Sequence, residues 1–591
     1  MSSTSSSTTS SESSSEELSK PLFFQKNNDV EEYNGKKKKK KKNKKKNLNN
    51  NGFYELNNGK DIVTKICENL NENITIIFQM IMGYGDMITD LIFFIFLTKS
   101  SSVEGYFKTL SFIFLLLPFA IFFFSTMKSL IFGMFDKEYD DDYFFNNGYK
   151  LLSSKNIANS GALFFFTHLI WSLLWFAHYF TQKLDHYNPL DSRTFQQKYY
   201  VFDDNYKPGG PLFFVINGED PLDVFWETYG LPMELSANHS ALVVSIEHRY
   251  YGDSVPFGFP LNPDNLAYLN AQQALSDLVT FREHVFTKYS LGKETKVFGF
   301  GCSYSGALSA WFRTKFPHLI DGVFSGSSPV EAVLNYTSFN TLVENVLEGS
   351  CGDSVVTAVQ QAETMLATEN GRAEIQRMFN ICSPIDTDWK VQLFKWQVRY
   401  QNQLVVQYQN PPNWPLTNFC NSLEKASDKL ETYGELLGWW HGACLELSVD
   451  ALFPPDGSCT WYWQKASEFA YYKPTPVGSK MMFQSIDLDF YDKLVQKIFG
   501  KKITPQVQET NRYFGGKNVD WNGIIFVNSV VEPWSLLSIT DKSLNSDKVQ
   551  VVTYDDAGHC APYHYYGSQM PEGVLNARKK IDEYIYKIVN Q

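Results

Sequence analysis

Six short apolar segments constrain the fold of this chain more than any other feature of its sequence. Each is rich in Val, Ile, Leu or Phe and ends near a turn or polar residue. Helical stretches lie between several of them, including 270–289 and 306–316. Short buried strands that alternate with helices indicate a mostly parallel sheet covered on both faces. The predicted strands are 211–217, 241–246, 295–300, 322–325, 523–528 and 549–553.

Between about 335 and 500 this alternation stops. The segment is rich in Trp, Gln, Tyr and Cys and has mainly helical character. We therefore predict a helical cap domain, 335–500, inserted into a sheet domain whose two parts are 181–334 and 501–591.

The N-terminal third has a different composition. Residues 1–60 are Ser-, Lys- and Asn-rich and are predicted to be a disordered tail, with no cleavable signal peptide. Residues 74–180 form a hydrophobic region with one to three predicted transmembrane helices. The candidate spans are 109–127, 161–180 and, less apolar because of Asp86 and Asp90, 74–97.

Charge and cysteine content favour a particular compartment. Lysines at 36–42 and 44–46 predict a cytoplasmic N-terminus. An odd number of crossings, three or else one, then places residue 181 onward in the endolysosomal lumen or at the cell surface. Five cysteines between 351 and 459, and candidate glycosylation sites at Asn238 and Asn335, agree with an oxidising space. The net charge of −11 argues against a general nucleic-acid binder.

The run FGFGCSYSGALSAW at 298–311 carries the chemistry. A strand ends, small residues permit a sharp turn with Ser303 at its apex, and a helix begins, which is the pattern of a nucleophile elbow. A seryl nucleophile needs a base and an acid that orients the base. Glu532 and His559 follow two late predicted strands, in the chain order Ser, acid, His. We expect them to meet at the carboxyl ends of the strands.

Several separated motifs resemble the S28 family of serine peptidases over about 410 residues. They begin at Phe180 (FTQKLDHY), Glu247 (EHRYYGDSVP), Tyr268 (YLNAQQALSD), Ser303 (SYSG) and Trp311 (WFRTKFPHL). The resemblance implies an α/β-hydrolase core with an inserted helical cap, preceded here by the transmembrane helices and the disordered N-terminus.

The resemblance also implies roles for individual residues and a substrate class. Ser303 would be the nucleophile, and His559 the general base and then the acid for the leaving amine. Tyr304 and the Gly218–Glu219 loop would supply the oxyanion hole. The activity implied is that of an exopeptidase on peptides, often beside proline, without metal or cofactor. Expected partners are a peptide substrate and a membrane but no nucleic acid, with a homodimer left open.

Departures from the family pattern keep a second hypothesis open. Glu532 replaces the family's Asp, Asp220 adds a carboxylate to the oxyanion loop, and Cys302 replaces a Gly. The leading hypothesis is a membrane-anchored serine exopeptidase. The alternative is a catalytically impaired, peptidase-like membrane protein that acts in binding, and a lipase or esterase is a third reading. Cys302 and Cys560 are expected to lie close together as free thiols.

Overall fold

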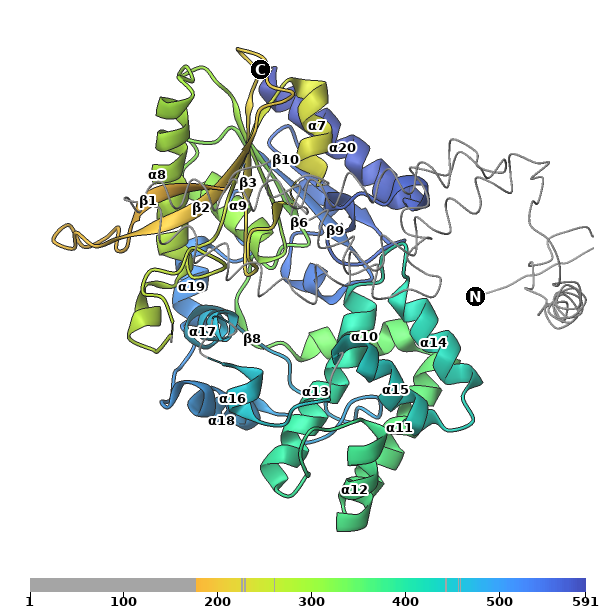
Figure 1. Cartoon of the computed structure of the whole chain (residues 1–591). Helices are drawn as coiled ribbons and strands as arrows, with labels where there is room; N and C mark the ends of the chain where they lie inside the picture. Colours follow the sequence, from red (N-terminus) through yellow and green to blue (C-terminus); the bar gives the residue numbers. More distant parts are fainter. Residues whose placement is uncertain are drawn as a thin grey trace, which may run out of the picture. The chain divides into compact units, whose positions relative to one another are not determined.

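The computed structural model describes residues 177–590, except 225, 226, 228, 229, 260, 442, 443, 455, 456 and 458. An eight-stranded sheet has the order β1-β2-β4-β3-β5-β6-β9-β10 (Figure 1). Strand β2 is antiparallel to β1 and β4, and every other neighbouring pair is parallel. The strands are β1 His178–Lys183, β2 Thr194–Phe202, β3 Leu212–Ile216, β4 Leu242–Ile246, β5 Val297–Cys302, β6 Gly322–Gly326, β9 Ile524–Ser529 and β10 Val549–Tyr554.

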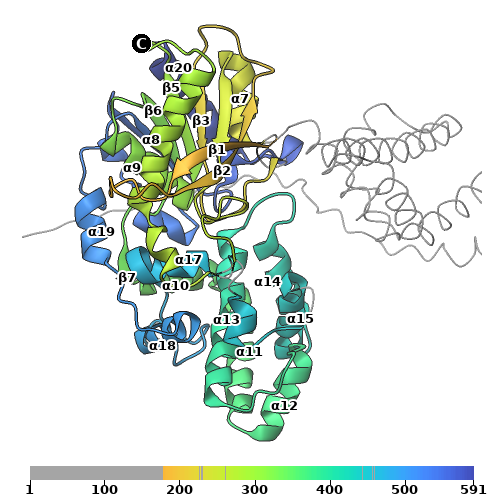
Figure 2. The same ribbon diagram turned by 60° about the vertical axis from the view of Figure 1, so that its left-hand side comes forward.

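Helices cover both faces of this sheet (Figures 1 and 2). Alternate side chains of a strand point to opposite faces, so Phe214 of β3 packs into one apolar cluster and Phe213 into another. The first cluster includes helices α8 (Ala271–Lys288) and α9 (Tyr304–Lys315). The second includes α7 (Leu231–His239) and α20 (Glu572–Val589).

The predicted α/β sheet is confirmed. All six predicted strands and both predicted helices are present, with ends displaced by no more than about two residues. Strands β1 and β2 were not predicted. Their exposed Thr, Gln and Lys residues alternate with buried ones, so neither strand forms a continuous apolar run.

A largely helical segment follows β6 and gathers beyond one end of the sheet (Figures 1 and 2). Two short parallel strands, β7 (Val333–Asn335) and β8 (Ala470–Tyr472), pair within it. The predicted domain limits at 335 and 500 stay a prediction. The helices are α10 Thr337–Leu347, α11 Ser350–Leu366, α12 Glu369–Met378, α13 Asp388–Gln407, α14 Pro415–Lys425, α15 Lys429–His441, α16 Val449–Leu452, α17 Thr460–Gln464 and α18 Leu488–Phe499, and α19 (Val507–Phe514) leads back to the sheet.

The end of one predicted membrane span is wrong. The span 161–180 was extended through Phe180, but residues 178–180 belong to β1, where Phe180 packs on Phe281 of α8 with ring centroids 5.9 Å apart. Phe180 therefore serves the packing of the sheet against α8. The spans 74–97 and 109–127, the rest of 161–180, and the predicted tail lie outside the described residues. Within those residues, no helix is both long and apolar enough for a bilayer crossing.

One buried polar network joins three of the sequence motifs. Arg249 donates to both carboxylate oxygens of Asp277, at 2.7 and 2.6 Å, and to the carbonyl oxygen of Leu184. His186 contacts the same carboxylate at 2.8 Å. Burial alone would raise the pKa of Asp277, but Arg249 and His186 together lower it. These motif residues therefore hold β1 and α8 to the segment after β4 rather than take part in chemistry.

We expect Asp277→Asn to lower the free energy of unfolding by about 3–5 kcal/mol, because it leaves the buried Arg249 without its counter-charge. Urea unfolding followed by tryptophan fluorescence measures the loss. Glu374→Gln, which breaks the exposed ion pair with Arg377, is the control and should cost at most about 1 kcal/mol. Equal losses in the two variants would contradict the structural role of the network.

Candidate active site

Ser303 occupies the turn between β5 and α9. Its backbone has φ 62° and ψ −131°, a conformation that L-residues rarely adopt and that surrounding contacts must maintain. The Ser303 N–H donates to the carbonyl oxygen of Gly326 on the neighbouring strand, at 2.9 Å. The side chain of Ser305 bonds both the N–H and the carbonyl oxygen of Cys302. The turn is therefore the predicted elbow, and contacts from β6 and from the start of α9 hold its shape.

Two glycines allow this turn to form. A Cβ on Gly301 would overlap the carbonyl oxygen of Ser305, and one on Gly306 would lie 2.7 Å from the carbonyl oxygen of Gly326. Helix α9 thus packs directly on the backbone of β5 and β6. The N-terminus of the helix, with its unpaired N–H groups and partial positive charge, follows Ser303 at once.

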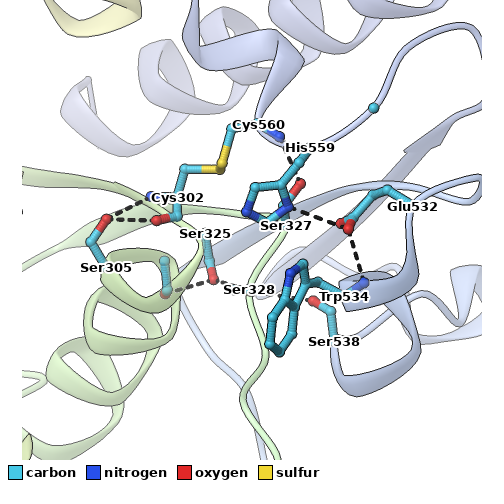
Figure 3. Close-up of a disulfide and its surroundings, with 12 residues drawn as sticks. Cys302, Ser305, Ser325, Ser327, Ser328, Glu532, Trp534, Ser538, His559 and Cys560 are labelled. Atoms are coloured by element: carbon cyan, nitrogen blue, oxygen red, sulfur yellow. Dashed lines mark hydrogen bonds and ion pairs between the residues drawn. A yellow bond between two sulfur atoms is a disulfide. The ribbon is translucent and has the colours of Figure 1, made fainter. Parts of the chain in front are cut away.

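The predicted base and acid also meet. His559 Nδ1 lies 3.3 Å from Glu532 Oε2, and both side chains are buried (Figure 3). Glu532 caps the 3₁₀ helix η4 (Pro533–Leu537), because its Oε2 accepts from the N–H of Trp534 at 2.8 Å. The His559–Glu532 contact is close enough for an ion pair but lacks hydrogen-bond alignment, and Glu532 Oε1 has no partner among the described residues.

The loop that carries His559 is held by the end of α13. The N–H of His559 donates to the carbonyl oxygen of Gln407 at 2.7 Å, and Asn410 donates to the carbonyl oxygen of His559 at 2.9 Å. Gly558 donates to the side-chain oxygen of Asn410 at 2.8 Å. A Cβ on Gly558 would overlap Gln407. The helical segment thus sets the position of the histidine.

Cys302 and Cys560 form a disulfide, so the expectation of free thiols is wrong (Figure 3). The elbow and the histidine loop bring the two Cα atoms to 5.9 Å, within the range that a disulfide spans. Two further disulfides, Cys351–Cys420 and Cys382–Cys444, lie in the helical segment. Of the described residues, Cys382, Cys444 and Glu446 form a group with metal-ligand spacing, but its two sulfur atoms are bonded to each other.

Ser303 opens into a cavity of about 420 Å³. Aromatic side chains from the helical segment, among them Trp396, Tyr400, Trp461 and Tyr462, line most of it. Ser303 and His559 both lie in the described part of the chain, and no hydrogen bond joins them there. Catalytic hydrogen bonds are often formed only when substrate binds.

The predicted oxyanion loop lies beside the elbow. A Cβ on Gly218 would lie 3.3 Å from the backbone nitrogen of Ser305 and 3.6 Å from the ring of Tyr304, so this loop faces the start of α9. Glu219 and Asp220 line the cavity with Ser303. Burial, and then the charge of Asp220, raise the pKa of Glu219 to about 7. Burial also raises the pKa of Asp220.

The candidate glycosylation sites are both accessible. Asn238 is exposed near the end of α7, and Asn335 is exposed at the end of β7. The Thr337 hydroxyl of the second triplet donates to the Asn335 side chain. Accessibility is compatible with glycosylation, which stays a prediction.

Three cations on the cavity wall were not singled out from the sequence: Arg399, Lys465 and Lys473. The Lys473 ammonium lies 3.5 Å from the centroid of the Phe339 ring, and Arg399 donates to the Lys473 carbonyl oxygen at 2.6 Å. Throughout the described part of the chain, no carboxylate forms an ion pair with any of the three. Burial and Arg399 lower the pKa of Lys465 to about 7, and burial, Lys465 and Arg399 lower the pKa of Lys473 well below its usual range, so a bound anion would be needed to keep Lys473 charged. No local signal marks these residues, because they come from separate segments.

The sheet order and the serine elbow define an α/β-hydrolase. Residues 182–581 match the sequence model of the serine carboxypeptidase S28 family. The chain belongs to this family of serine peptidases, and the S28 resemblance is confirmed.

Relatives from distant organisms are similar over most of their length. A putative serine protease of Caenorhabditis elegans is 29% identical, with 68% of this chain and 86% of the relative covered. A probable serine protease of Arabidopsis thaliana is 32% identical (60% and 74%), and the lysosomal Pro-X carboxypeptidase of Mus musculus is 28% identical (68% and 86%). Among solved structures, a proline iminopeptidase of Mycobacterium smegmatis aligns with TM-score 0.31 and 9% identity over 70% of this chain and 99% of that one.

We expect kcat/KM for peptide hydrolysis to fall as the pH rises through about 7, because Glu219 then becomes charged beside the developing oxyanion. Glu219→Gln should make this decline shallower and match the wild type at pH 5; the decline that remains would come from Lys465, which loses its charge near the same pH. Asp220→Asn should move the decline to lower pH, since the Asp220 charge raises the pKa of Glu219. The measurement is a pH–rate profile for the three proteins. An unchanged decline in Glu219→Gln would contradict the assignment.

Proposed function

We propose that this serine peptidase is an exopeptidase in which Ser303, His559 and Glu532 act as nucleophile, base and orienting acid. The observation that carries the proposal is the meeting of the three segments at one edge of the sheet. His559 Nδ1 faces Glu532 at 3.3 Å, and the residue after His559 is disulfide-bonded to the residue before Ser303. Glutamate can orient an imidazole and stabilise its cation as aspartate does.

In the proposed reaction Ser303 Oγ attacks the scissile carbonyl while His559 Nε2 accepts its proton. The oxyanion receives hydrogen bonds from the backbone N–H of Tyr304 and from the loop Gly218–Glu219. His559 then donates the proton to the departing amine, and an acyl-enzyme remains on Ser303. Water, deprotonated by His559, hydrolyses the ester. Burial of His559 and Glu532 supports this scheme, because charge stabilisation is stronger away from solvent.

The cation wall formed by Arg399, Lys465 and Lys473 favours attack at the carboxyl end of a peptide. These cations share a cavity with Ser303 and lack a carboxylate partner within the described residues. A substrate's terminal carboxylate would supply the missing counter-charge. Lys465, whose pKa is about 7, gains its charge below that pH, so binding should strengthen under acidic conditions. We therefore favour a carboxypeptidase.

A second candidate function rests on the opposite charge in the same cavity. Glu219 and Asp220 line it as well, and a carboxylate pair can bind a peptide's terminal ammonium group. That arrangement would favour removal of residues from the amino end. The two candidates differ in which terminus must be free.

The aromatic lining supports an apolar or proline residue next to the scissile bond, as the name of the Pro-X carboxypeptidase relative also suggests. The three disulfides of the described residues support an oxidising compartment, either endolysosomal or at the cell surface. Membrane anchoring through the N-terminal region is part of the same proposal.

We expect Ser303→Ala to abolish labelling by a fluorophosphonate probe and to lower kcat by about 10⁴-fold or more. Glu532→Gln should lower kcat about 10⁴-fold, because the imidazole loses its orienting charge. Ser338→Ala, at an exposed position of α10, is the control and should behave as wild type. A folded wild type that is neither labelled nor active would instead favour the catalytically impaired protein.

We expect Lys465→Met and Lys473→Met each to raise KM for free-acid peptides about tenfold or more, since each removes a hydrogen-bond donor to the substrate carboxylate. C-amidated peptides should be poor substrates of every variant. Lys501→Met, at an exposed lysine, is the control. Hydrolysis that tolerates C-amidation but is abolished by N-acetylation would contradict the carboxypeptidase and support the second candidate.

A further inference from the structure

The disulfide Cys302–Cys560 connects the two reacting residues more directly than any other bond in the described structure. Cys302 precedes the nucleophile and Cys560 follows the base, although the two cysteines are 258 positions apart in the chain. Adjacent Cα atoms are about 3.8 Å apart, so each catalytic residue lies one peptide unit from the cross-link. A movement of either loop is transmitted to the other.

The noncovalent contacts that hold Ser303 and His559 fix each loop separately and do not join the two residues directly. Ser303 and His559, both within the described residues, share no hydrogen bond, and the His559–Glu532 contact is poorly aligned. Next to His559, the Cys560 N–H donates to Ser327 Oγ at 3.1 Å (Figure 3). A displacement of about 1 Å between reacting groups can cost a hundredfold in rate. Loss of the cross-link should therefore slow the chemical step.

Both cysteines also stand beside strained backbone. Cys560 has φ 58°, in the left-handed region, and Ser303 has φ 62°. Such conformations persist only where surrounding contacts over-determine them. The disulfide joins the two strained turns, and its loss would remove a constraint from both.

We propose that the Cys302–Cys560 disulfide positions His559 against Ser303 and makes turnover depend on the thiol–disulfide state of the surroundings. Both cysteines are partly exposed, so a small dithiol can reach the bond. One thiolate of the dithiol attacks a cysteine sulfur, the S–S bond breaks and the other cysteine leaves as a thiolate. The second thiol resolves the mixed disulfide. Two electrons and two protons pass to the enzyme, and the dithiol becomes a cyclic disulfide.

The inference rests on the proposed function, and its first test compares Cys302→Ala/Cys560→Ala with the control Cys382→Ser/Cys444→Ser, which removes a disulfide of the helical segment. We expect kcat to fall about 10- to 100-fold in the first variant, with KM changed less than about twofold and an unaltered near-ultraviolet circular dichroism spectrum. The control should retain its kcat. A wild-type kcat in the first variant would overturn the inference.

Reduction of the wild-type protein gives a second test that does not require a folded variant. Dithiothreitol should lower kcat to the level of the double variant, in step with alkylation of Cys302 and Cys560 measured by peptide mapping, and oxidised glutathione should restore it. Loss of activity in step with alkylation of Cys382, or with unfolding, would overturn the inference.

Hydrogen exchange separates this inference from the proposed function. We expect amide exchange in residues 555–563 to increase about tenfold on reduction under native conditions, while exchange in α8 stays unchanged. This result would support the positioning role even for a protein that cleaves no peptide. Unchanged exchange in 555–563 would overturn it even for an active peptidase.

Discussion

The close packing of α9 on β5 and β6 is the constraint on which the site depends. Without side chains at Gly301 and Gly306, the helix backbone comes into contact with the sheet, and the chain must turn sharply between them. Ser303 takes the strained position in that turn. The same packing aims the helix N-terminus at the cavity and brings the Gly218 loop against Tyr304. One steric requirement thus places the proposed nucleophile and the candidate oxyanion donors together.

The cavity combines groups that would neutralise each other if they were in contact. The cation wall of Arg399, Lys465 and Lys473 comes from the helical segment, whereas Glu219 and Asp220 come from the loop after β3. No ion pair joins the two groups within the described residues, and burial shifts the pKa values of the carboxylates and of both lysines toward their neutral forms, because unmatched charge is costly there. Buried unmatched charge is destabilising, which is reason to assign it to ligand binding rather than to folding. The terminal groups of a peptide match both signs.

Local pattern was sufficient for much of the fold and for the candidate triad. The parallel strands are continuous apolar runs, and the elbow at Ser303 is a contiguous motif, so both could be predicted from sequence. Strands β1 and β2 escaped prediction because only alternate residues are buried. The proximity of Cys302 and Cys560 was predicted, but the bond between them was not. The cation wall was not predicted, because its three residues come from separate segments and no local motif marks them. The predicted membrane span 161–180 extended into β1, because the aromatic residues at its end suit a strand as well as a membrane helix.

The substitution of glutamate for the family's aspartate is compatible with this geometry, because a backbone N–H of the next turn holds the glutamate carboxylate. Glu532 Oε2 accepts from the Trp534 N–H at the start of η4, so the carboxylate is held by the turn in which it stands. The histidine is held separately, by Gln407 at the end of α13 and by Asn410 in the turn that follows. The extra methylene of glutamate then changes the reach of an anchored carboxylate, whose Oε2 lies 3.3 Å from His559 Nδ1. The helical segment therefore both lines the cavity and holds the loop that carries His559.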